Sequence, residues 1–287
     1  MPKNSPRDRR APIPDSSIPH EYVIARRVLL DCLDLLAAQS GALVLVGAQA
    51  IYLQTPVLDV GLPASTTDGD IAIDPDLLFA NPDLAEVLEA ADFRPHTSPG
   101  TWFSPEGVPI DLMVPSGALP ASSRRTAHLE GQSGRTARRT SGLELALRDN
   151  NTMELRALDP NDTRVALVKV ASPAALVVAK LIKLDERIAG PKPDRILAKD
   201  ASDVLRMLRY NDAAAIGATL DRFATEGVGS GTIETAVKFL QSQLALRTSP
   251  VVELAVEYHR QFETGAQITA SYRTLAQRLV DGYGSKS

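Results

Sequence analysis

Two aspartates, Asp68 and Asp70, stand one residue apart at the start of an apolar alternation in the sequence. Because side chains of a strand alternate between its two faces, this spacing places both carboxylates on the same face. Two adjacent carboxylates repel each other unless a positive charge lies between them, and Mg²⁺ is a hard ion that prefers carboxylate and phosphate oxygens. The pattern predicts a metal-binding pair, with a solvated polar strand end as the alternative.

A third aspartate interrupts residues 108–114, an otherwise apolar segment that is typical of a central strand. Asp111 is costly to bury there unless it is paired, hydrogen-bonded or bound to a metal. An edge strand with Asp111 facing solvent is the alternative. This segment therefore adds a third candidate carboxylate to the first two.

A glycine-alanine turn lies between the apolar run of residues 42–46 and a helical pattern that begins with it. Small residues at such a turn let the backbone approach a ligand, and the N–H groups of a helix N-terminus bind phosphate. Gly47 and Ala48 are therefore candidate phosphate-binding residues. A strand-to-helix turn that serves packing alone is the alternative.

A lysine lies on the apolar side of a helical pattern that begins at Ser172-Pro173, where serine is a favoured cap and proline a favoured first residue. Lys183 and Arg187 continue the side of the helix on which Lys180 lies. Such a lysine either extends its charged end to the edge of the apolar surface or lies next to an anionic ligand.

A second helical pattern opens at Lys199-Asp200, and Asp203 follows three residues later. Asp200 can cap this helix and Asp203 can lie in its first turn, so capping is a sufficient explanation for both carboxylates. Further helical patterns, which indicate a small helical domain, cover residues 213–222, 233–246, 251–262 and 268–280.

Arginines are concentrated in one segment, among serines, threonines and glycines that favour exposed strands or a loop over a helix. Arginine and hydroxyl side chains suit contacts to phosphates, which position a nucleic acid without reading its bases. A solvated surface that balances acidic neighbours is the alternative. The arginines of this segment are Arg124, Arg125, Arg135, Arg138, Arg139 and Arg148.

The composition is that of a soluble globular protein: 287 residues with 44% apolar and 23% charged residues suffice for one large domain or two of ordinary size. A net charge of −4 argues against general polyanion binding. The single cysteine, Cys32, suits a reducing cytosol. Since the sequence has no secretory signal and no apolar run that could span a bilayer, we expect a cytoplasmic protein without a membrane partner.

Hydrophobic periodicity places the candidate residues on a mixed set of elements. Helices are expected over residues 19–39, from Gly47, over 81–91 with Asn81 as cap and Pro82 in the first turn, and from 173 and 199. Strands are expected over residues 42–46, 68–74, 153–158 and 164–170, and as a pair over 93–114 with a turn at 105–107. Residues 1 to about 18 are typical of a mobile basic arm.

The order of the candidate residues resembles the active-site pattern of the nucleotidyltransferases that share the DNA polymerase β fold. In that superfamily a Gly-Gly or Gly-Ser turn binds the triphosphate, an Asp-x-Asp pair on the next strand holds the metals, and a carboxylate on a later strand completes the cluster. Two residues depart from the pattern, since Ala48 lacks a hydroxyl and Gly69 replaces an apolar residue. The matching residues are Gly47, Ala48, Asp68, Asp70 and Asp111.

The long gap between Gly47 and Asp68, together with the segment Lys199-Asp200-x-x-Asp203 after a helical Lys180, is similar to toxins of the AbiEii and MenT type. That resemblance implies Mg²⁺ or Mn²⁺ bound by Asp68, Asp70 and Asp111, and a supporting role for Asp200 or Asp203. The nucleotide-binding residues that it implies are Gly47, Ala48, Thr67, Lys180 and Lys183. The arginines expected to bind RNA are Arg124, Arg125, Arg135, Arg138 and Arg139.

The resemblance further implies an α+β (α/β) fold with two lobes, a polymerase-β-like mixed sheet with flanking helices and a C-terminal helical domain. We expect the arm over residues 1–18, the nucleotidyltransferase domain over 19–170 and the helical domain over 171–287. The implied function is transfer of NMP from an NTP to the 3′ end of tRNA, as the toxin of a toxin-antitoxin system with a cognate antitoxin. The alternatives are nucleotidylation of a small molecule or a protein, and a catalytically inactive protein that binds a nucleotide or an antitoxin.

Overall fold

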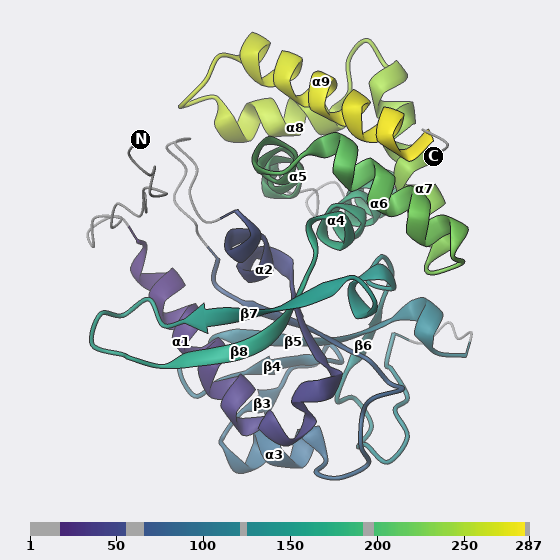
Figure 1. Cartoon of the computed structure of the whole chain (residues 1–287). Helices are drawn as coiled ribbons and strands as arrows, with labels where there is room; N and C mark the ends of the chain where they lie inside the picture. Colours follow the sequence, from purple (N-terminus) through teal and green to yellow (C-terminus); the bar gives the residue numbers. More distant parts are fainter. Residues whose placement is uncertain (1–17, 56–65, 121–124, 192–197, 285–287) are drawn as a thin grey trace, which may run out of the picture.

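The computed structural model describes residues 18–55, 66–120, 125–191 and 198–284. A mixed sheet forms one layer, and the C-terminal helices gather on one side of it (Figure 1). This arrangement confirms the α+β expectation. The expected basic arm, apart from Ile18, and Arg124 lie outside the described residues, and the domain boundary near residue 170 stays a prediction.

The sheet has eight strands in the order β3-β4-β5-β2-β1-β8-β7, with β6 paired to β5. β1 runs antiparallel to β2, whereas β5 runs parallel to β2 and β8 runs parallel to β1. The strands are β1 (Leu43–Val46), β2 (Gly69–Ile73), β3 (Arg94–Pro95), β4 (Thr101–Phe103), β5 (Pro109–Pro115), β6 (Arg138–Thr140), β7 (Asn150–Arg156) and β8 (Val165–Ala171). The strands predicted over residues 42–46, 68–74, 153–158 and 164–170 are confirmed within a few residues, whereas the expected pair over 93–114 is three strands, β3, β4 and β5, and β6 was not predicted.

Helices cover both faces of the sheet: α1 and α3 lie on one face, and α2 lies on the other with the C-terminal helices (Figure 1). The α-helices are α1 (His20–Leu35), α2 (Gly47–Gln54), α3 (Leu84–Ala90), α4 (Pro173–Ile188), α5 (Ala198–Tyr210), α6 (Ala213–Thr225), α7 (Ser230–Ala245), α8 (Pro250–His259) and α9 (Gly265–Gly284). Short 3-10 helices cover Ala37–Ala42, Ser116–Ala118 and Leu145–Leu147. Ser172 caps α4 as expected, because its Oγ accepts a hydrogen bond from the Ala175 N–H.

The expected start of α3 is wrong by a few residues. Asp83, not Asn81, is the cap, and its Oδ1 accepts hydrogen bonds from the N–H groups of Ala85 and Glu86. The Asn81–Pro82 peptide bond is cis, and Pro82 precedes the helix. An aspartate cap satisfies the free N–H groups of the first turn as well as asparagine does, so cap preference alone does not distinguish position 81 from position 83.

Gly69 opens β2 where the structure has no room for a side chain. A Cβ at this position would lie 2.7 Å from Cδ1 of Ile110 and 3.1 Å from Cδ1 of Leu29. Leu29 belongs to α1 and is fully buried. The glycine therefore lets α1 pack directly against β2, and packing explains this departure from the expected pattern.

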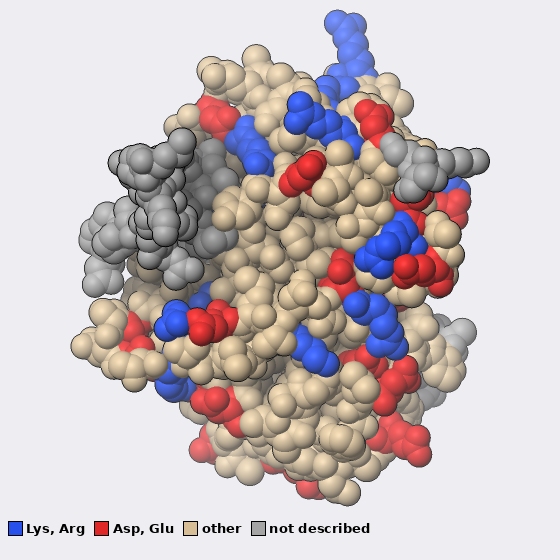
Figure 2. Space-filling model, viewed as in Figure 1, with Lys and Arg blue, Asp and Glu red and all other residues tan. Residues whose placement is uncertain are grey.

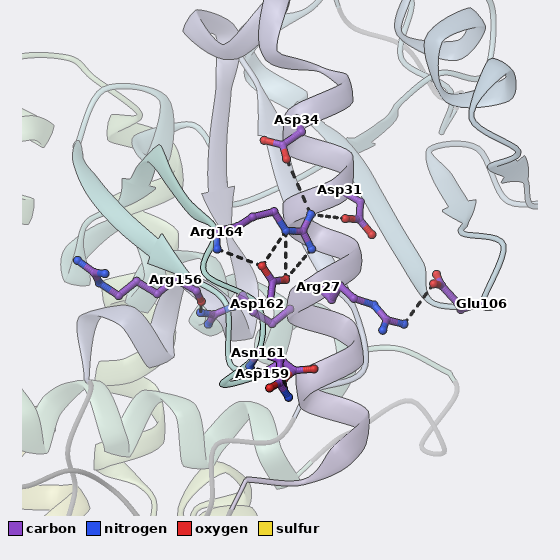
Figure 3. A network of polar contacts seen from close by, with 10 residues as sticks. Arg27, Asp31, Asp34, Glu106, Arg156, Asp159, Asn161, Asp162 and Arg164 are labelled. Atoms are coloured by element: carbon purple, nitrogen blue, oxygen red, sulfur yellow. Dashed lines mark hydrogen bonds and ion pairs between the residues drawn. The ribbon is translucent and has the colours of Figure 1, made fainter. Parts of the chain in front are cut away.

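Ion pairs fix the turn of the β7–β8 hairpin to α1 (Figure 3). Nη1 of Arg164 lies 2.5 Å from Oδ1 of Asp31, and its Nη2 lies 2.7 Å from Oδ2 of Asp162. Arg27 on the same helix pairs with Glu106 in the β4–β5 turn, at 3.2 Å. These contacts join α1 to the β7–β8 hairpin at one edge of the sheet and to the β4–β5 turn towards the other edge. They help to keep α1 on the face of the sheet opposite the C-terminal helices.

Charges are interspersed over the face of the molecule shown in Figure 2, which agrees with a net charge of −4. None of the helices in the described parts of the chain is long and apolar enough to cross a membrane.

Candidate active site

Asp70 and Asp111 lie side by side on neighbouring strands. The parallel register of β2 and β5 pairs Asp70 with Asp111, and the antiparallel register of β1 and β2 pairs Asp70 with Val46. Asp70 therefore lies in the middle of the sheet, where β1 ends and the turn into α2 begins. Asp111 is on an inner strand, so the edge-strand interpretation is wrong.

Asp68 precedes β2, which begins one residue later than expected. Its Oδ1 accepts a hydrogen bond from the Thr66 hydroxyl at 2.5 Å, and its backbone carbonyl accepts one from Nε2 of Gln49 at 3.2 Å. Gln49 is buried in α2 and is itself held by the buried Arg26, whose Nε donates to its Oε1 at 2.7 Å. Asp68 is thus fixed from two sides next to Asp70.

Gly47 makes room for the carboxylate of Asp70. Its φ is +66°, and a Cβ there would lie only 1.9 Å from Oδ2 of Asp70. Every other residue type would force Asp70 to move and would strain the backbone. The glycine turn and the aspartate pair, which the sequence presents as separate signals, are therefore parts of one site.

Asp70 lies close to two other negative charges, those of Asp68 and Asp111. Burial raises the pKa of its carboxyl group, and the charges of Asp68 and Asp111 raise it further, to about 7. Lys183 and Lys180 oppose these effects only in part. The surrounding cations therefore do not offset burial and the repulsion from Asp68 and Asp111.

Asp111 has a cationic partner within the chain. Nη1 of Arg138 lies 2.7 Å from its Oδ1, and the hydroxyl of Thr101 donates to the same oxygen at 2.6 Å. Burial alone would lower the pKa of Arg138, but the hydrogen bond and charge of Asp111 raise it, with further contributions from Asp70 and Asp68. Its guanidinium therefore interacts with all three carboxylates.

The donor set fits a hard divalent cation. Asp68 and Asp70 supply only oxygen donors, which Mg²⁺ and Mn²⁺ prefer, and the raised pKa of Asp70 marks a local deficit of positive charge. As the side chains stand, no three histidine, cysteine or carboxylate residues of the described chain form a metal-binding group. Asp111, held by Arg138, is the member that would complete one.

A cleft of about 790 Å³ opens over these carboxylates, between the sheet and α4. Gly47, Asp70 and Asp111 line its sheet side. Residues of α4 and of the segment just after it line the opposite side of the cleft. Residues of β6 and of the segments next to it in the sequence line the remaining wall. The basic residues on these two walls are Lys180, Lys183, Arg187, Arg125, Arg138 and Arg139.

Lys180 joins α4 to α5 through both candidate aspartates. Its Nζ lies 2.7 Å from Oδ1 of Asp200 and 2.7 Å from Oδ2 of Asp203. Lys183 and Arg187 also bind Asp200, at 3.0 and 2.8 Å. Capping is therefore the wrong explanation for Asp200 and Asp203, and Asp203 lies beyond the first turn of α5, because α5 begins at Ala198.

The pKa values of Asp200 and Lys180 move in the directions of stable ion pairs. Burial would raise the pKa of Asp200, but Lys180 and Lys183 outweigh burial and bring it to about 2. Burial would likewise lower the pKa of Lys180, but Asp203 and Asp200 raise it above the ordinary value. For Lys183, burial and the charge of Lys180 lower the pKa.

Several predicted site residues lie away from the cleft. Ala48 is buried, and Thr67 is exposed outside the lining. Arg135 donates to the carbonyls of Thr97 and His96 and does not line the cleft. Arg148 pairs with Asp74 at 2.6 Å instead of joining the basic wall.

Sequence reasoning missed two contributors to the site. Thr101 reaches Asp111 because β4 and β5 pair in a register that sets these two residues opposite each other, and no local signal reveals that register. Arg138 was grouped with RNA-binding arginines, although it faces the aspartates. Arg138 lies next to Asp111 because β6 pairs with β5, and the local sequence does not reveal that pairing.

A family model described as nucleotidyltransferase matches residues 28–211, well over half of the chain. The matched region contains Asp68, Asp70, Asp111 and the Lys180 cluster, and it ends just before α6. No curated protein and no solved structure matches the chain.

Proposed function

This chain belongs to the nucleotidyltransferase family, and from that premise we propose that it is a metal-dependent enzyme that transfers NMP from an NTP to an acceptor hydroxyl. The observation that carries the proposal is that two carboxylates, Asp70 and Asp111, and a cationic helix face line one cleft, with Asp68 next to Asp70. A triphosphate with divalent cations is a ligand whose charges complement both walls.

Asp68 and Asp70 are the residues that would hold Mg²⁺ or Mn²⁺, with Asp111 as a further ligand or as the base for the acceptor. Such an ion would neutralise phosphate charge and activate an oxygen nucleophile. The protein holds the two aspartates rigidly, through the Gly47 turn and through the hydrogen bonds to Asp68. Rigid ligands keep the reacting groups in line.

The phosphates of the nucleotide would lie between the Gly47 turn and α4. Lys183 has a side chain that is 40% exposed and lines the cleft, so it can contact a phosphate directly. Lys180 is only 10% exposed and is held by two aspartates, so it adds positive charge from behind. In this assignment Asp200 and Asp203 orient the cations and do not touch the nucleotide.

The reaction forms one oxygen–phosphorus bond and breaks another. The acceptor hydroxyl attacks the α-phosphorus, the bond between the α-phosphorus and the bridging oxygen breaks, and pyrophosphate leaves with that electron pair. The proton of the hydroxyl passes to a carboxylate of the site or to water. Lys183 lies on the side of the cleft where the negative charge of the leaving group would build up.

We assign the acceptor as the 3′ end of tRNA, with growth arrest and a cognate antitoxin as the biological setting, and the cytoplasm as the location. The support is the similarity of the Lys180 and Asp200–Asp203 segments to the AbiEii and MenT toxins, together with the basic wall of Arg125 and Arg139. A wall of this charge suits a polyanion better than a small cationic substrate.

The experiment incubates the protein with Mg²⁺, total tRNA and each NTP labelled at the α-phosphate. The proposal predicts labelled tRNA with at least one NTP, no label from the same NTP labelled at the γ-phosphate, and loss of transfer in Asp70→Asn by about a thousandfold. Label on a protein or a small molecule would reassign the acceptor. No transfer from any NTP to any acceptor would mean that the chain is not a nucleotidyltransferase in function.

A further inference from the structure

We propose that Arg138 is a built-in counter-ion of the aspartate cluster, which holds Asp111 and competes with the divalent cation for it. The inference rests on the proposed function, because it presumes that the aspartates are metal ligands. It assigns Arg138 to the metal site, and not to the wall that contacts an acceptor. Arg138 acts through Asp111 and is therefore a positioning residue.

The contacts of the Arg138 side chain are those of a counter-ion. Its backbone pairs with Met113 in the parallel β5–β6 ladder, and its side chain reaches back to Asp111, where Nη1 binds Oδ1 at 2.7 Å. The same Nη1 lies 3.4 Å from Oγ1 of Thr101, which binds the same carboxylate oxygen. The guanidinium and the hydroxyl thus converge on a single oxygen of Asp111.

The Arg138 guanidinium also offsets negative charge in the aspartate cluster. Both side chains of the pair are about one-fifth exposed, at 21% for Arg138 and 20% for Asp111, so the attraction is only partly screened by solvent. Asp70 is paired with Asp111 in register, which brings the guanidinium close to the charges of both strands. Arg138 supplies positive charge where Asp68, Asp70 and Asp111 repel one another.

Neighbouring arginines show that this placement is particular to Arg138. Arg139 is next in the strand, yet its Nη2 donates to the Pro120 carbonyl at 2.6 Å and pairs with no carboxylate in the described contacts. Arg135, three residues earlier, donates to the carbonyls of Thr97 and His96. Arg135 is therefore a matched control of the same type, charge and segment.

The metal ion and the Arg138 guanidinium compete because their interactions with Asp111 are thermodynamically linked. A cation that binds Asp111 places a second positive charge beside the guanidinium and competes with it for the same carboxylate, so each weakens the binding of the other by the same factor. In the absence of nucleotide, Arg138 keeps the metal affinity low. When the nucleotide arrives with its metal, the phosphates offer Arg138 a new anionic partner, which favours binding of metal and nucleotide together.

The test measures Mn²⁺ binding to the full chain without nucleotide, by calorimetry, in wild type, Arg138→Gln and Arg135→Gln. Removing the competing charge should tighten Mn²⁺ binding in Arg138→Gln by about tenfold or more, a factor of ten being about 1.4 kcal/mol. The affinity of Arg135→Gln should stay within about twofold of wild type. Unchanged or weaker binding in Arg138→Gln would overturn the proposal.

Asp70→Asn separates failure of this inference from failure of the proposed function. If Asp70→Asn loses Mn²⁺ binding while Arg138→Gln binds as wild type does, only the role of Arg138 is wrong. If Asp70→Asn binds Mn²⁺ as wild type does, the aspartates are not the metal site and both proposals fail.

The wild-type chain answers the same question if Arg138→Gln does not fold. Phenylglyoxal modifies accessible arginines, and peptide mass spectrometry locates the product. Modification of Arg138 should rise when Mn²⁺ is added, because the guanidinium loses its carboxylate partner, whereas modification of Arg135 should not change. Equal reactivity of Arg138 with and without Mn²⁺ would contradict the competition.

Discussion

The cleft brings together two clusters of charged residues that differ in their balance of charge. In the aspartate cluster, Arg138 pairs with Asp111 alone among Asp68, Asp70 and Asp111, and the pKa of Asp70 rises to about 7. In the helix cluster, Lys180, Lys183 and Arg187 surround Asp200, and its pKa falls to about 2. The first cluster has too little positive charge, and the second is complete.

This difference indicates what each cluster does. Ion pairs around a buried aspartate join two helices and need no metal ion to balance the carboxylates. A set of carboxylates that repel one another gains from any cation that enters, which is a property of metal sites. We infer that the helix cluster supports the site and that the aspartate cluster performs the chemistry.

Breaking the helix cluster should have the largest effect on stability. Lys180→Met leaves two buried aspartates without their shared partner, and we expect a loss of about 3–5 kcal/mol in the free energy of unfolding. Lys183→Met is the control, because Asp200 keeps Lys180 and Arg187, and should cost about 1 kcal/mol or less. Urea denaturation measures both, and equal losses would contradict a central role for Lys180.

Two glycines separate the effects of the site from those of packing: Gly47 makes room for Asp70, and Gly69 makes room for Ile110 and Leu29. In Gly47→Ala the new Cβ displaces the carboxylate of Asp70, so transfer activity should fall by about a hundredfold. In Gly69→Ala the Cβ meets side-chain ends of Ile110 and Leu29, so the cost should be about 1–2 kcal/mol of stability. Steady-state kinetics and denaturation of both variants check this division, and equal activity in the two would contradict it.

The free energy of unfolding should depend on pH because of the uncompensated charge in the aspartate cluster. In EDTA, Asp70 binds its proton more tightly in the folded state, with a pKa of about 7 against an ordinary 3.8. Stability should therefore fall as pH rises through this window, by about 4 kcal/mol. Asp70→Asn should remove that slope. A slope that survives in Asp70→Asn would assign the proton to another group.

The complete cluster should show the opposite slope, at lower pH. The pKa of Asp200 is about 2 in the folded state against an ordinary 3.8, so its contribution is present above about pH 4 and is lost as pH falls toward 2. We expect a loss of about 2 kcal/mol. Acid denaturation of Asp70→Asn, in which the other slope is absent, measures it. Stability that stays constant over this range would count against the ion pairs of Asp200.

Local sequence patterns predicted most of the fold around the site. The apolar run of β1, the glycine at its end and the helical period of α4 each carry a short-range signal, and the structure has these elements where they were expected. The start of α3 was less accurate, because Asn81 and Asp83 cap a helix equally well.

Partners across elements could not be predicted in the same way. Thr101 and Arg138 meet Asp111 through strand register, and Lys180 meets Asp200 through the packing of α4 on α5. Strand register and helix packing depend on the whole core and not on the nearby sequence. The sequence therefore identified the charged residues but not their partners within the chain.

Thermal unfolding of wild type and Asp70→Asn at pH 7, in EDTA and in saturating Mg²⁺, tests the central claim most directly. Our account predicts a reversal: Asp70→Asn is the more stable protein in EDTA, because the repulsion is gone, and Mg²⁺ stabilises wild type but not Asp70→Asn. An Asp70→Asn protein that is less stable than wild type in EDTA, or that gains as much from Mg²⁺, would contradict an incomplete metal site.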